Sequence, residues 1–487
     1  MKKFAFILAI MLFVPLFMVG CGQETESLTA YSMNLEYNDE TKTLSGSMVV
    51  DYVNNSDNAF NELLFHLYPN AFRQDAKCKP VSSANESAAY PNGKSYGDIA
   101  INGVFNGTSE LSFEITGEDK NILKVTLPTQ LYPDERVKVN IVFETRLACI
   151  DHRLGYGTNA INFGNFYPIV CVYEDKTGFM TKPYSSNGDP FYSEIADYQV
   201  TLTYPEKFVL ASSGVEERTS SKDGQKCSMI KGEKIRDFCF VLSEKFKVES
   251  GKVGDTIINY FYYDDEARDH SLQVACDAVE YFNKSFGQYP YKTLAVVQTN
   301  FVHGGMEYPN LVMISDSTKG KDYDYVIVHE IAHQWWYGVV GSNQYSHAWQ
   351  DEGLTDYSAF LFFRENTEYG QDFETFVDGA TASYKLFVEL FTKLNGKADT
   401  SMERDLDQFA TEPEYVACTY TKGALLFDTL RESLGERKFF KALQNYYKYY
   451  SFKNASPADM IASFESSTGY ELEGFFASWL NGDVVIL

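Results

Sequence analysis

The segment Tyr325–Tyr357 reads YVIVHEIAHQWWYGVVGSNQYSHAWQDEGLTDY and holds histidine and glutamate residues at a metal-binding spacing. His329 and His333 are four residues apart, so on a helix both imidazoles project from one face and can reach the same ion. Glu352 follows His333 after 18 intervening residues. Two histidines and one glutamate are an established ligand set of catalytic zinc, which keeps a further position for water. The sequence therefore predicts one zinc ion held by His329, His333 and Glu352, with Glu330 beside it.

The residues around this motif are almost all apolar. A helix that is hydrophobic nearly all round is buried, and buried histidine and glutamate side chains need polar partners or a metal. The alternative, a surface helix with two solvated histidines, does not fit this composition. We expect the first helix to end near Gly338 and Gly341, and a second helix to start near Gln350. The apolar flanking residues are Tyr325, Val326, Val328, Ile331, Ala332, Trp335, Trp336 and Val339.

Three motifs in this chain resemble those of one enzyme family. The pentapeptide HEIAH at 329–333, followed after 18 residues by the glutamate of QDEGL, is similar to the zinc site of the aminopeptidase N family of gluzincin metallopeptidases. Upstream, HGGMEY at 303–308 is similar to the family's Gly-x-Met-Glu-Asn exopeptidase signature. Downstream, YTKG at 420–423 matches its Tyr-x-Lys-Gly motif. The resemblance extends from about residue 28 to the end, but Tyr308 stands where the family usually has Asn.

The resemblance implies a zinc-dependent aminopeptidase that removes the first residue of peptides with a free amino terminus. Glu330 would be the general base, and Tyr420 would donate a hydrogen bond to the oxyanion. Glu307 would hold the substrate's α-ammonium group, and the glycines before it would let a peptide lie alongside as an added strand. The family often adds an acid or amide from its amino-terminal domain, for which Asn159 and Asn162 are candidates. The implied substrate-binding set is Gly304, Gly305, Met306 and Glu307.

Other functions remain open at this point. A zinc endopeptidase would share the metal ligands and Glu330, but it needs no partner for a substrate ammonium group, so Glu307 argues against it. Epoxide hydrolysis, which occurs in one branch of the family, is disfavoured for an exported bacterial protein. A non-enzymatic envelope lipoprotein that captures peptides would be expected to carry a broken ligand or base. No ligand or base of the motif is broken here.

The first 20 residues have the composition of a targeting segment. Lys2 and Lys3 precede an apolar run from Phe4 to Phe17, which is too short for an ordinary membrane-spanning helix. The small residues before Cys21 resemble the bacterial lipoprotein cleavage box. We therefore expect a lipoprotein signal peptide over 1–20, a lipid-bearing Cys21 and a polar tether over 21–27. The expected location is the bacterial cell envelope, with attachment to the membrane through the lipid; a plain secretory signal is the alternative.

Charge and cysteine content restrict the possible partners and the source of stability. The chain has 42 basic and 67 acidic side chains, which give a formal net charge of −25. This acidic excess disfavours nucleic acid as a partner. The 8 cysteines include no C-x-x-C pair, so the sequence does not predict a disulfide framework. Stability must therefore come from hydrophobic cores.

The predicted fold class is a multidomain α+β chain, because 487 residues exceed what one core normally supports. Short segments of alternating apolar residues, separated by turns, predict an all-β saddle or sandwich domain over 28–248. The segment 249–487 is expected to form a mostly helical zinc-peptidase domain, thermolysin-like by the resemblance. We expect the chain to become helical around 251–264. An amphipathic stripe ending at Gly287 and a strand over 294–298 should then precede the HGGMEY motif.

Overall fold

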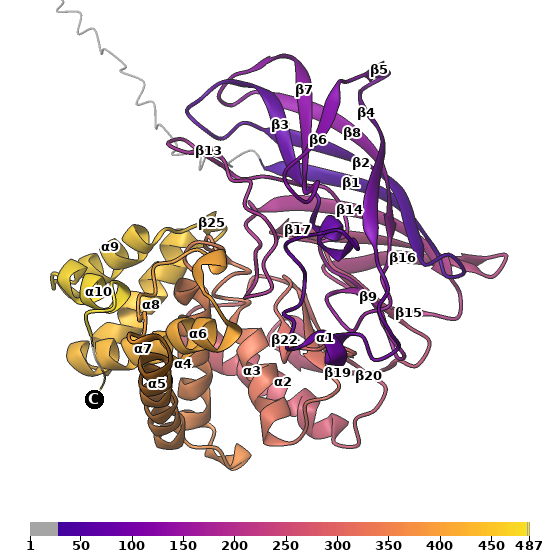
Figure 1. The fold of residues 1–487 in the computed structure, drawn as a ribbon. Helices are drawn as coiled ribbons and strands as arrows, with labels where there is room; N and C mark the ends of the chain where they lie inside the picture. The colour runs from indigo at the N-terminus through magenta and orange to yellow at the C-terminus, as the bar shows by residue number, and fades with distance from the viewer. Residues whose placement is uncertain (1–27, 485, 487) are drawn as a thin grey trace, which may run out of the picture.

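The computed structural model describes residues 28–484 and 486. The expected signal peptide, the tether and Cys21 lie outside the described residues. Among the helices that are described, none combines the length and the apolar character needed to cross a membrane. The described chain has a strand-rich part, residues 28–246, here called the β half, and a helix-rich part, residues 247–484, here called the helical half (Figure 1).

The β half is built on an eight-stranded sheet of order β16-β17-β14-β1-β2-β8-β4-β5. Strand β1 pairs in parallel with β14, from Thr29 opposite Ala196 to Glu36 opposite Thr203, and antiparallel with β2. Alternate residues of β1 are buried, as expected for a sheet with one face on the core. The strands are β1 (Thr29–Asn38), β2 (Thr43–Val53), β4 (Asp98–Asn106), β5 (Ser109–Glu110), β8 (Arg136–Arg146), β14 (Ala196–Pro205), β16 (Val215–Lys222) and β17 (Gln225–Ile235).

Smaller sheets complete the β half and share its core. One has the order β11-β3-β7-β6, with β3 (Phe60–His66), β6 (Phe113–Thr116), β7 (Ile122–Leu131) and β11 (Ile169–Val170). Another has the order β15-β18-β10-β9, with β9 (Leu154–Tyr156), β10 (Ile161–Phe163), β15 (Val209–Ser212) and β18 (Phe240–Ser243). A hairpin of β12 (Tyr173–Glu174) and β13 (Gly178–Phe179), a 3-10 turn η1 (Tyr68–Phe72) and a short helix α1 (Glu86–Ala89) lie in the connections.

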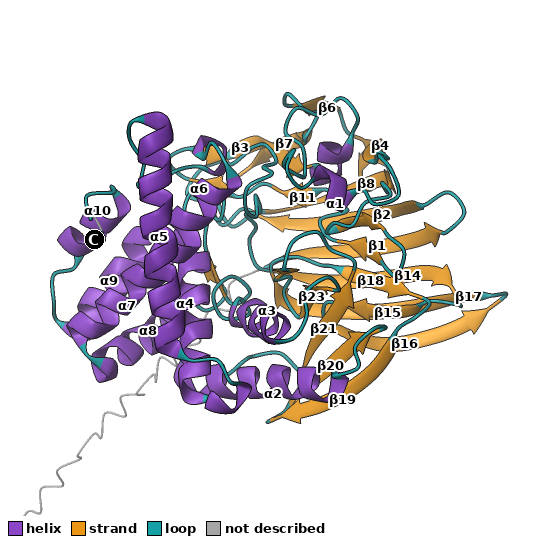
Figure 2. Cartoon of the chain, turned by 60° about the horizontal axis from the view of Figure 1, so that its bottom comes forward, coloured by secondary structure: helices purple, strands orange, loops and turns teal. Residues whose placement is uncertain are grey.

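The helical half begins with a five-stranded sheet of order β19-β20-β21-β23-β22. Its strands are β19 (Lys247–Val253), β20 (Thr256–Tyr262), β21 (Thr293–Thr299), β22 (Gly305–Met306) and β23 (Leu311–Ser315). The helices are α2 (Arg268–Ser285), α3 (Lys321–Ala332), α4 (Trp349–Glu365), α5 (Phe373–Asn395), α6 (Glu412–Val416), α7 (Lys422–Leu434), α8 (Glu436–Tyr450), α9 (Pro457–Thr468) and α10 (Glu473–Leu480). Short elements are η2 (Thr367–Tyr369), η3 (Leu406–Gln408), the π-helical turn η4 (Ala417–Thr421), β24 (Val340–Gly341) and β25 (Lys453–Asn454). Figure 2 shows α3 between the strand-rich and helix-rich sides of the molecule.

The predicted order, an all-β part followed by a mostly helical part, is confirmed, but the stretch 251–264 is not helical. It belongs to the hairpin of β19 and β20, in which Ile258, Tyr260 and Tyr262 are buried while Ile257 is exposed. This alternation of β-branched and aromatic residues fits a strand rather than a helix. The boundary expected between residues 248 and 249 falls inside β19.

The helix of the HEIAH motif ends earlier than expected. Helix α3 stops at Ala332, and the chain continues in turns, in which the amide of Gly338 donates to the carbonyl of His333 at 2.9 Å. The amide of Val339 donates to the carbonyl of Gln334 at 3.1 Å in the same way. These wider turns satisfy the first carbonyls after the end of the helix. Helix α4 starts at Trp349, one residue before the expected start.

Arg236, the residue after β17, joins the two halves. It is buried, and its Nε donates to the carbonyl of Tyr337 at 2.7 Å while its Nη2 donates to that of Lys453 at 2.5 Å. Its Nη1 donates to the carbonyl of Ser193 at 3.0 Å and to the side chain of Asn454. A guanidinium group from the β half is thus satisfied largely by carbonyls of the helical half.

Candidate metal centre and substrate cleft

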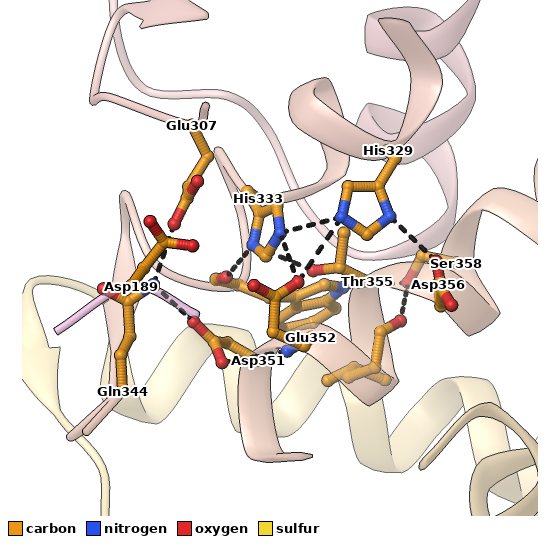
Figure 3. A network of polar contacts seen from close by, with 12 residues as sticks. Asp189, Glu307, His329, His333, Gln344, Asp351, Glu352, Thr355, Asp356 and Ser358 are labelled. Atoms are coloured by element: carbon orange, nitrogen blue, oxygen red, sulfur yellow. Dashed lines mark hydrogen bonds and ion pairs between the residues drawn. The ribbon is translucent and has the colours of Figure 1, made fainter. Parts of the chain in front are cut away.

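Two helices bring the predicted metal ligands together. His329 lies in the last turn of α3, His333 caps that helix, and Glu352 lies in the first turn of α4 (Figure 3). Nε2 of His333 lies 3.2 Å from Nε2 of His329 and 3.1 Å from Oε2 of Glu352. Nε2 of His329 lies 3.4 Å from the same carboxylate oxygen. These spacings match the distance of about 3.3 Å between ligands of a tetrahedral ion with bonds of about 2.05 Å.

The protein groups alone leave this cluster short of positive charge. Burial lowers the pKa of His333, but the carboxylates of Glu352 and Glu307 outweigh it and raise this pKa to about 10. Burial raises the pKa of the Glu352 carboxyl, yet the two imidazoles hold it well below its ordinary value. Two buried imidazole nitrogens and a carboxylate that converge on one point are a donor set suited to a divalent cation. The residues present therefore fit the predicted metal.

Further side chains orient the two imidazoles. Nδ1 of His329 lies 2.9 Å from Oδ1 of Asp356, which also accepts a 2.6 Å hydrogen bond from Oη of Tyr325. Nδ1 of His333 lies 3.1 Å from the carbonyl of Trp336. Such contacts at Nδ1 direct Nε2 toward a metal. Sequence analysis missed Asp356, although its position four residues after Glu352 places both on one face of α4.

Glu330 lies against the HGGMEY strand and is buried. A Cβ built on Gly305 would lie 2.3 Å from Oε1 of Glu330, so a larger residue at this position would force the carboxylate to move. Its Oε2 is buried and has no hydrogen-bond partner among the described residues. Burial raises the pKa of Glu330 from 4.5 to about 8. The structure thus provides a carboxylate near the metal donors whose Oε2 is not occupied by a protein partner.

Tyr420 reaches the same place from η4. Its ring stacks on that of His329 with centroids 6.0 Å apart. Lys422 holds the adjoining start of α7, because its Nζ donates to the carbonyls of Thr400 and Trp479, each at 2.7 Å. A π-helical turn at a functional site is a recurring feature of proteins, and here it places the phenol over the metal donors.

Glu307 faces the metal donors from the end of β22, and Asp189 joins it from the β half. Figure 3 shows both on the side of His333 and Glu352 that lies away from Asp356. Carboxylate oxygens of Asp189, Glu307 and Glu352 lie within 4.8 Å of one another. The amide of Gln344 donates to Glu307 at 2.8 Å. Burial and then the charge of Asp189 raise the pKa of Glu307 to about 7.

The two asparagines considered as partners of Glu307 are engaged elsewhere. Nδ2 of Asn159 donates to Asp316 at 3.1 Å, and Nδ2 of Asn162 donates to the carbonyl of His152 at 2.9 Å. The residue of the β half at this place is Asp189, which sequence analysis missed. It lies in a loop with no regular hydrophobic period, and only the Gly188-Asp189-Pro190 turn signal marked it.

Comparison with known proteins places the metal donors and the HGGMEY and YTKG motifs in one family. Residues 270–479 match the model described as "Peptidase family M1 domain". The chain carries a peptidase family M1 domain. The resemblance to the aminopeptidase N family, which the motifs indicated, is thereby confirmed.

Relatives of the M1 domain are distant and longer than this chain. Aminopeptidase M1-B of Oryza sativa subsp. japonica is 25% identical over 222 residues, which are 43% of this chain and 25% of the rice protein. Aminopeptidase N of Streptomyces lividans is 26% identical over 225 residues, 44% of this chain and 26% of that protein. The chain thus matches about a quarter of the length of these relatives.

Solved structures with the M1 name share the fold over both halves. An M1 zinc metallopeptidase from Deinococcus radiodurans aligns with a TM-score of 0.63 and 16% identity, covering 94% of each chain. A mutant of that protein bound to a Tyr-Ser-Ala substrate aligns with a TM-score of 0.63 and 17% identity, again over 94% of each chain. The predicted architecture is therefore confirmed for nearly the whole described chain.

Tyr308, the departure from the family motif, points away from the cleft of the M1 domain. Its Oη donates to Oδ1 of Asn165 in the β half at 2.5 Å. A Cβ on Gly164 would lie 2.0 Å from this Oη, so Gly164 makes the room that the larger side chain needs. Tyr308 is fully buried and packs in the core of the β half.

A cavity of about 370 Å³ lies in front of Glu330 and Tyr420. The M1 domain supplies His303, Gly304 and Gly305 along one wall, and the β half supplies others. The β-half residues of this wall are Pro80, Arg153, Ser186, Gly188 and Asp189. The cleft is therefore built jointly by the two halves.

Proposed function

We propose that this chain is a zinc-dependent aminopeptidase that removes the amino-terminal residue from peptides. The observation that carries the proposal is that Asp189 and Glu307 lie beside the metal donor Glu352, with carboxylate oxygens of the three within 4.8 Å of one another. A substrate ammonium group at this point would balance their charge and place the first peptide bond at the metal donors. The names of the relatives and the Tyr-Ser-Ala complex of the deinococcal protein support the same reaction class.

One zinc ion would be held by His329, His333 and Glu352. When bound, zinc acts as a Lewis acid that polarises the carbonyl group and lowers the pKa of water to about 7. Two further clusters of ligand-type side chains in the described chain share His333 or Glu352 with the first, which supports a single ion. The residue contacts at both Nδ1 atoms leave each Nε2 free for the metal.

Glu330 would take the proton from the attacking water and return it to the leaving amine. Its raised pKa, caused by burial, is typical of a general base that works near neutral pH. The Oε2 atom without a protein partner is available for this proton. Gly305 keeps the space between Glu330 and the peptide free of side-chain atoms.

Tyr420 would donate its phenol hydrogen to the oxygen that becomes negative as the carbonyl is attacked. Burial and then the charge of Glu352 raise the pKa of Tyr420 well above its ordinary value, so the group keeps its proton. A donor held in place before the reaction stabilises this charge without reorganisation. Lys422 fixes the turn that carries it.

The carboxylate cluster also favours an aminopeptidase over an endopeptidase. Glu307 is 3% exposed, so it is no solvent-facing edge residue. An internal peptide segment would have to pass uncharged amides through this buried carboxylate cluster, which would leave the carboxylates unpaired. A free ammonium group satisfies them instead. The endopeptidase alternative therefore lacks support from the geometry.

The experiment that tests the function compares matched substrates. The purified, zinc-loaded chain is assayed on alanine p-nitroanilide and on its N-acetylated form, with Glu330→Gln as the control for contaminating peptidases. We expect the free form to be cleaved and the acetylated form to be spared. Equal cleavage of both would favour the endopeptidase, and no cleavage of any aminoacyl amide would contradict the proposal.

We also propose export and attachment to the bacterial cell envelope through lipid on Cys21. The support is the sequence pattern alone, since Cys21 precedes the described residues. Membrane fractionation of the parent chain and of Cys21→Ala tests it. Loss of membrane partitioning in the variant is expected, and equal partitioning of both proteins would favour a plain secretory signal.

A further inference from the structure

Arg153, the residue before β9, is the only lysine or arginine among the described residues that line the cavity. The same walls carry four acidic side chains, those of Asp189, Glu330, Asp356 and Glu412. Arg153 is only 6% exposed and stacks over the ring of Phe191, with 5.0 Å from its Cζ to the ring centroid. A single buried cation in an acidic cleft calls for a specific explanation.

The guanidinium of Arg153 is not satisfied by the protein. Its one hydrogen bond within the described chain runs from Nη1 to Asp189, and its buried Nε has no partner there. Arg236, the other buried arginine described above, donates from all three of its nitrogens. A guanidinium carries five N–H donors, and burying them without acceptors is costly. Unlike Arg236, Arg153 faces a cavity that a ligand can enter.

The position of Arg153 relates it to the second residue of a bound peptide. Its partner Asp189 belongs to the carboxylate cluster proposed to hold the substrate ammonium group. His303, at the opposite end of the HGGMEY motif from Glu307, lines the same cavity as Arg153 and contacts His152, the residue before Arg153, with ring centroids 5.8 Å apart. A peptide that starts at Glu307 and runs antiparallel along Gly305 therefore leads toward Arg153.

Charge balance and length point to the same ligand. A substrate ammonium group bound at Asp189 would compete with Arg153 for the negative charge of this carboxylate. The positive charge of the guanidinium would then be only partly balanced. A substrate carboxylate at Arg153 would restore the balance and accept the unused N–H groups. An extended residue spans about 3.3 Å, so the amino and carboxyl ends of a dipeptide lie roughly 7 Å apart. Both ends can therefore be bound at once only by groups that lie close together, as Arg153 and Asp189 do through their direct hydrogen bond.

We propose that Arg153 is a binding site for a carboxylate of the substrate, foremost the C-terminal carboxylate of a dipeptide. The inference rests on the proposed function and narrows its substrates to short peptides with two charged ends. The same chemistry could be supplied by an acidic side chain after the scissile bond. Binding of either carboxylate requires the paired N–H donors of the Arg153 guanidinium group.

The test measures binding rather than turnover. Isothermal titration of the zinc-loaded Glu330→Gln chain compares Ala-Ala with Ala-Ala-amide, which differ only in the terminal carboxylate. We expect Ala-Ala to bind about 10-fold tighter or better, in line with a charge-assisted bidentate contact. Ala-Asp-amide against Ala-Asn-amide separates the second source: an advantage there identifies an acidic side chain as a ligand of Arg153.

Variants assign the preference to Arg153. Arg153→Met in the same background should abolish the carboxylate advantage, and Arg153→Lys should keep only part of it. Arg146→Met is the matched control, since Arg146 pairs with Asp98 at 2.8 Å outside the cavity walls and should leave the ratio unchanged. If Arg153→Met does not fold, Arg153→Lys carries the assignment, since an undiminished carboxylate advantage in that variant would contradict the role of the guanidinium group. The inference would be overturned if Ala-Ala bound no tighter than Ala-Ala-amide and Ala-Asp-amide bound no tighter than Ala-Asn-amide. It would also be overturned if the carboxylate advantage persisted in Arg153→Met.

Failure of this inference and failure of the proposed function give different results. Alanine p-nitroanilide has no carboxylate, so its hydrolysis by the parent chain reports the function alone. Hydrolysis without any carboxylate preference in binding overturns the role of Arg153 and leaves the aminopeptidase standing. Absence of hydrolysis overturns the function, whatever the binding ratio is.

Discussion

Gly353 in α4 and Gly423 in α7 touch through their backbones. A Cβ on Gly353 would lie 2.7 Å from Cα of Gly423, and a Cβ on Gly423 would lie 2.6 Å from Cα of Gly353. Gly353 follows the metal donor Glu352, and Gly423 lies three residues after Tyr420. The contact therefore sets the distance between a metal donor and the phenol.

Gly353→Ala should separate these helices. We expect a cost of about 1–3 kcal/mol in unfolding free energy, typical of overpacking, and a fall in kcat because Tyr420 moves. Thermal unfolding and kcat measure the two effects. Gly379→Ala in α5 is the control, since nothing lies within 4 Å of its added Cβ. Unchanged activity and melting temperature in Gly353→Ala would show that the helices can adjust.

Glu330→Gln should separate proton transfer from metal binding. Because Glu330 is not one of the metal donors, we expect zinc content to stay at the parent level while kcat falls by roughly 10²- to 10⁴-fold. Metal analysis by mass spectrometry and steady-state rates on alanine p-nitroanilide provide the readouts. A variant that loses its zinc would reassign Glu330 to the metal.

Loss of a metal donor should weaken zinc binding more than loss of the carboxylate of Asp356 that supports His329. Glu352→Ala should abolish stoichiometric zinc binding, because a site with three protein ligands has no spare one. Asp356→Asn should weaken zinc affinity by only about 10- to 100-fold, since it removes a partner of His329 and leaves all three ligands. Competition with a chelator of known affinity measures both. Equal losses in the two variants would contradict the assigned order.

Asp189 and Glu307 should share the recognition of the substrate amino group. Asp189→Asn removes one negative charge from the cluster, so we expect a raised KM for alanine p-nitroanilide and a smaller discrimination against the acetylated form. Asp316→Asn is a control, because Asp316 binds Asn159 and does not line the cleft. Discrimination as strong as in the parent would remove Asp189 from the site.

Asp237 should make stability depend on pH. It accepts hydrogen bonds from Oη of Tyr167 at 2.8 Å and Nδ2 of Asn165 at 2.5 Å, but burial outweighs them and raises its pKa from 3.8 to about 7. Between about pH 4 and pH 7 the folded state thus keeps a proton that the unfolded state has released, so the free energy of unfolding falls as pH rises.

Asp237→Asn should remove this part of the pH dependence. Denaturant unfolding at about pH 5 and about pH 8 should show a smaller loss of stability in the variant than in the parent. Asp134→Asn, at an exposed turn, serves as the control. A loss in Asp237→Asn as large as in the parent would show that other groups cause it.

The convergence of His329, His333 and Glu352 could be predicted from the sequence because its signals are local. The spacing of His329 and His333 on one helix decides which side chains converge, and a second helix brings Glu352 to them. Tyr420 and Glu307 were found through motifs for the same reason. Asp189 and Arg153 were not, because they reach the cleft through loops whose course depends on packing between the two halves.

Element boundaries were less predictable. The residues of the β19–β20 hairpin were predicted to begin the helical region, because both strands are short and neither carries a motif. The long helix α5 carries no chemistry-bearing residue and was not predicted at all. The end of α3 at Ala332 depends on turn geometry that the glycines at 338 and 341 did not reveal.

The insertion of Arg236 into the helical half ties folding to catalysis. Separating the two halves would leave the guanidinium of Arg236 and its carbonyl acceptors without hydrogen-bond partners. The halves should therefore unfold as one cooperative unit. The cleft would then exist only in the fully assembled chain, because Asp189 comes from one half and the metal donors from the other. Partly folded chains would consequently carry no hydrolytic activity.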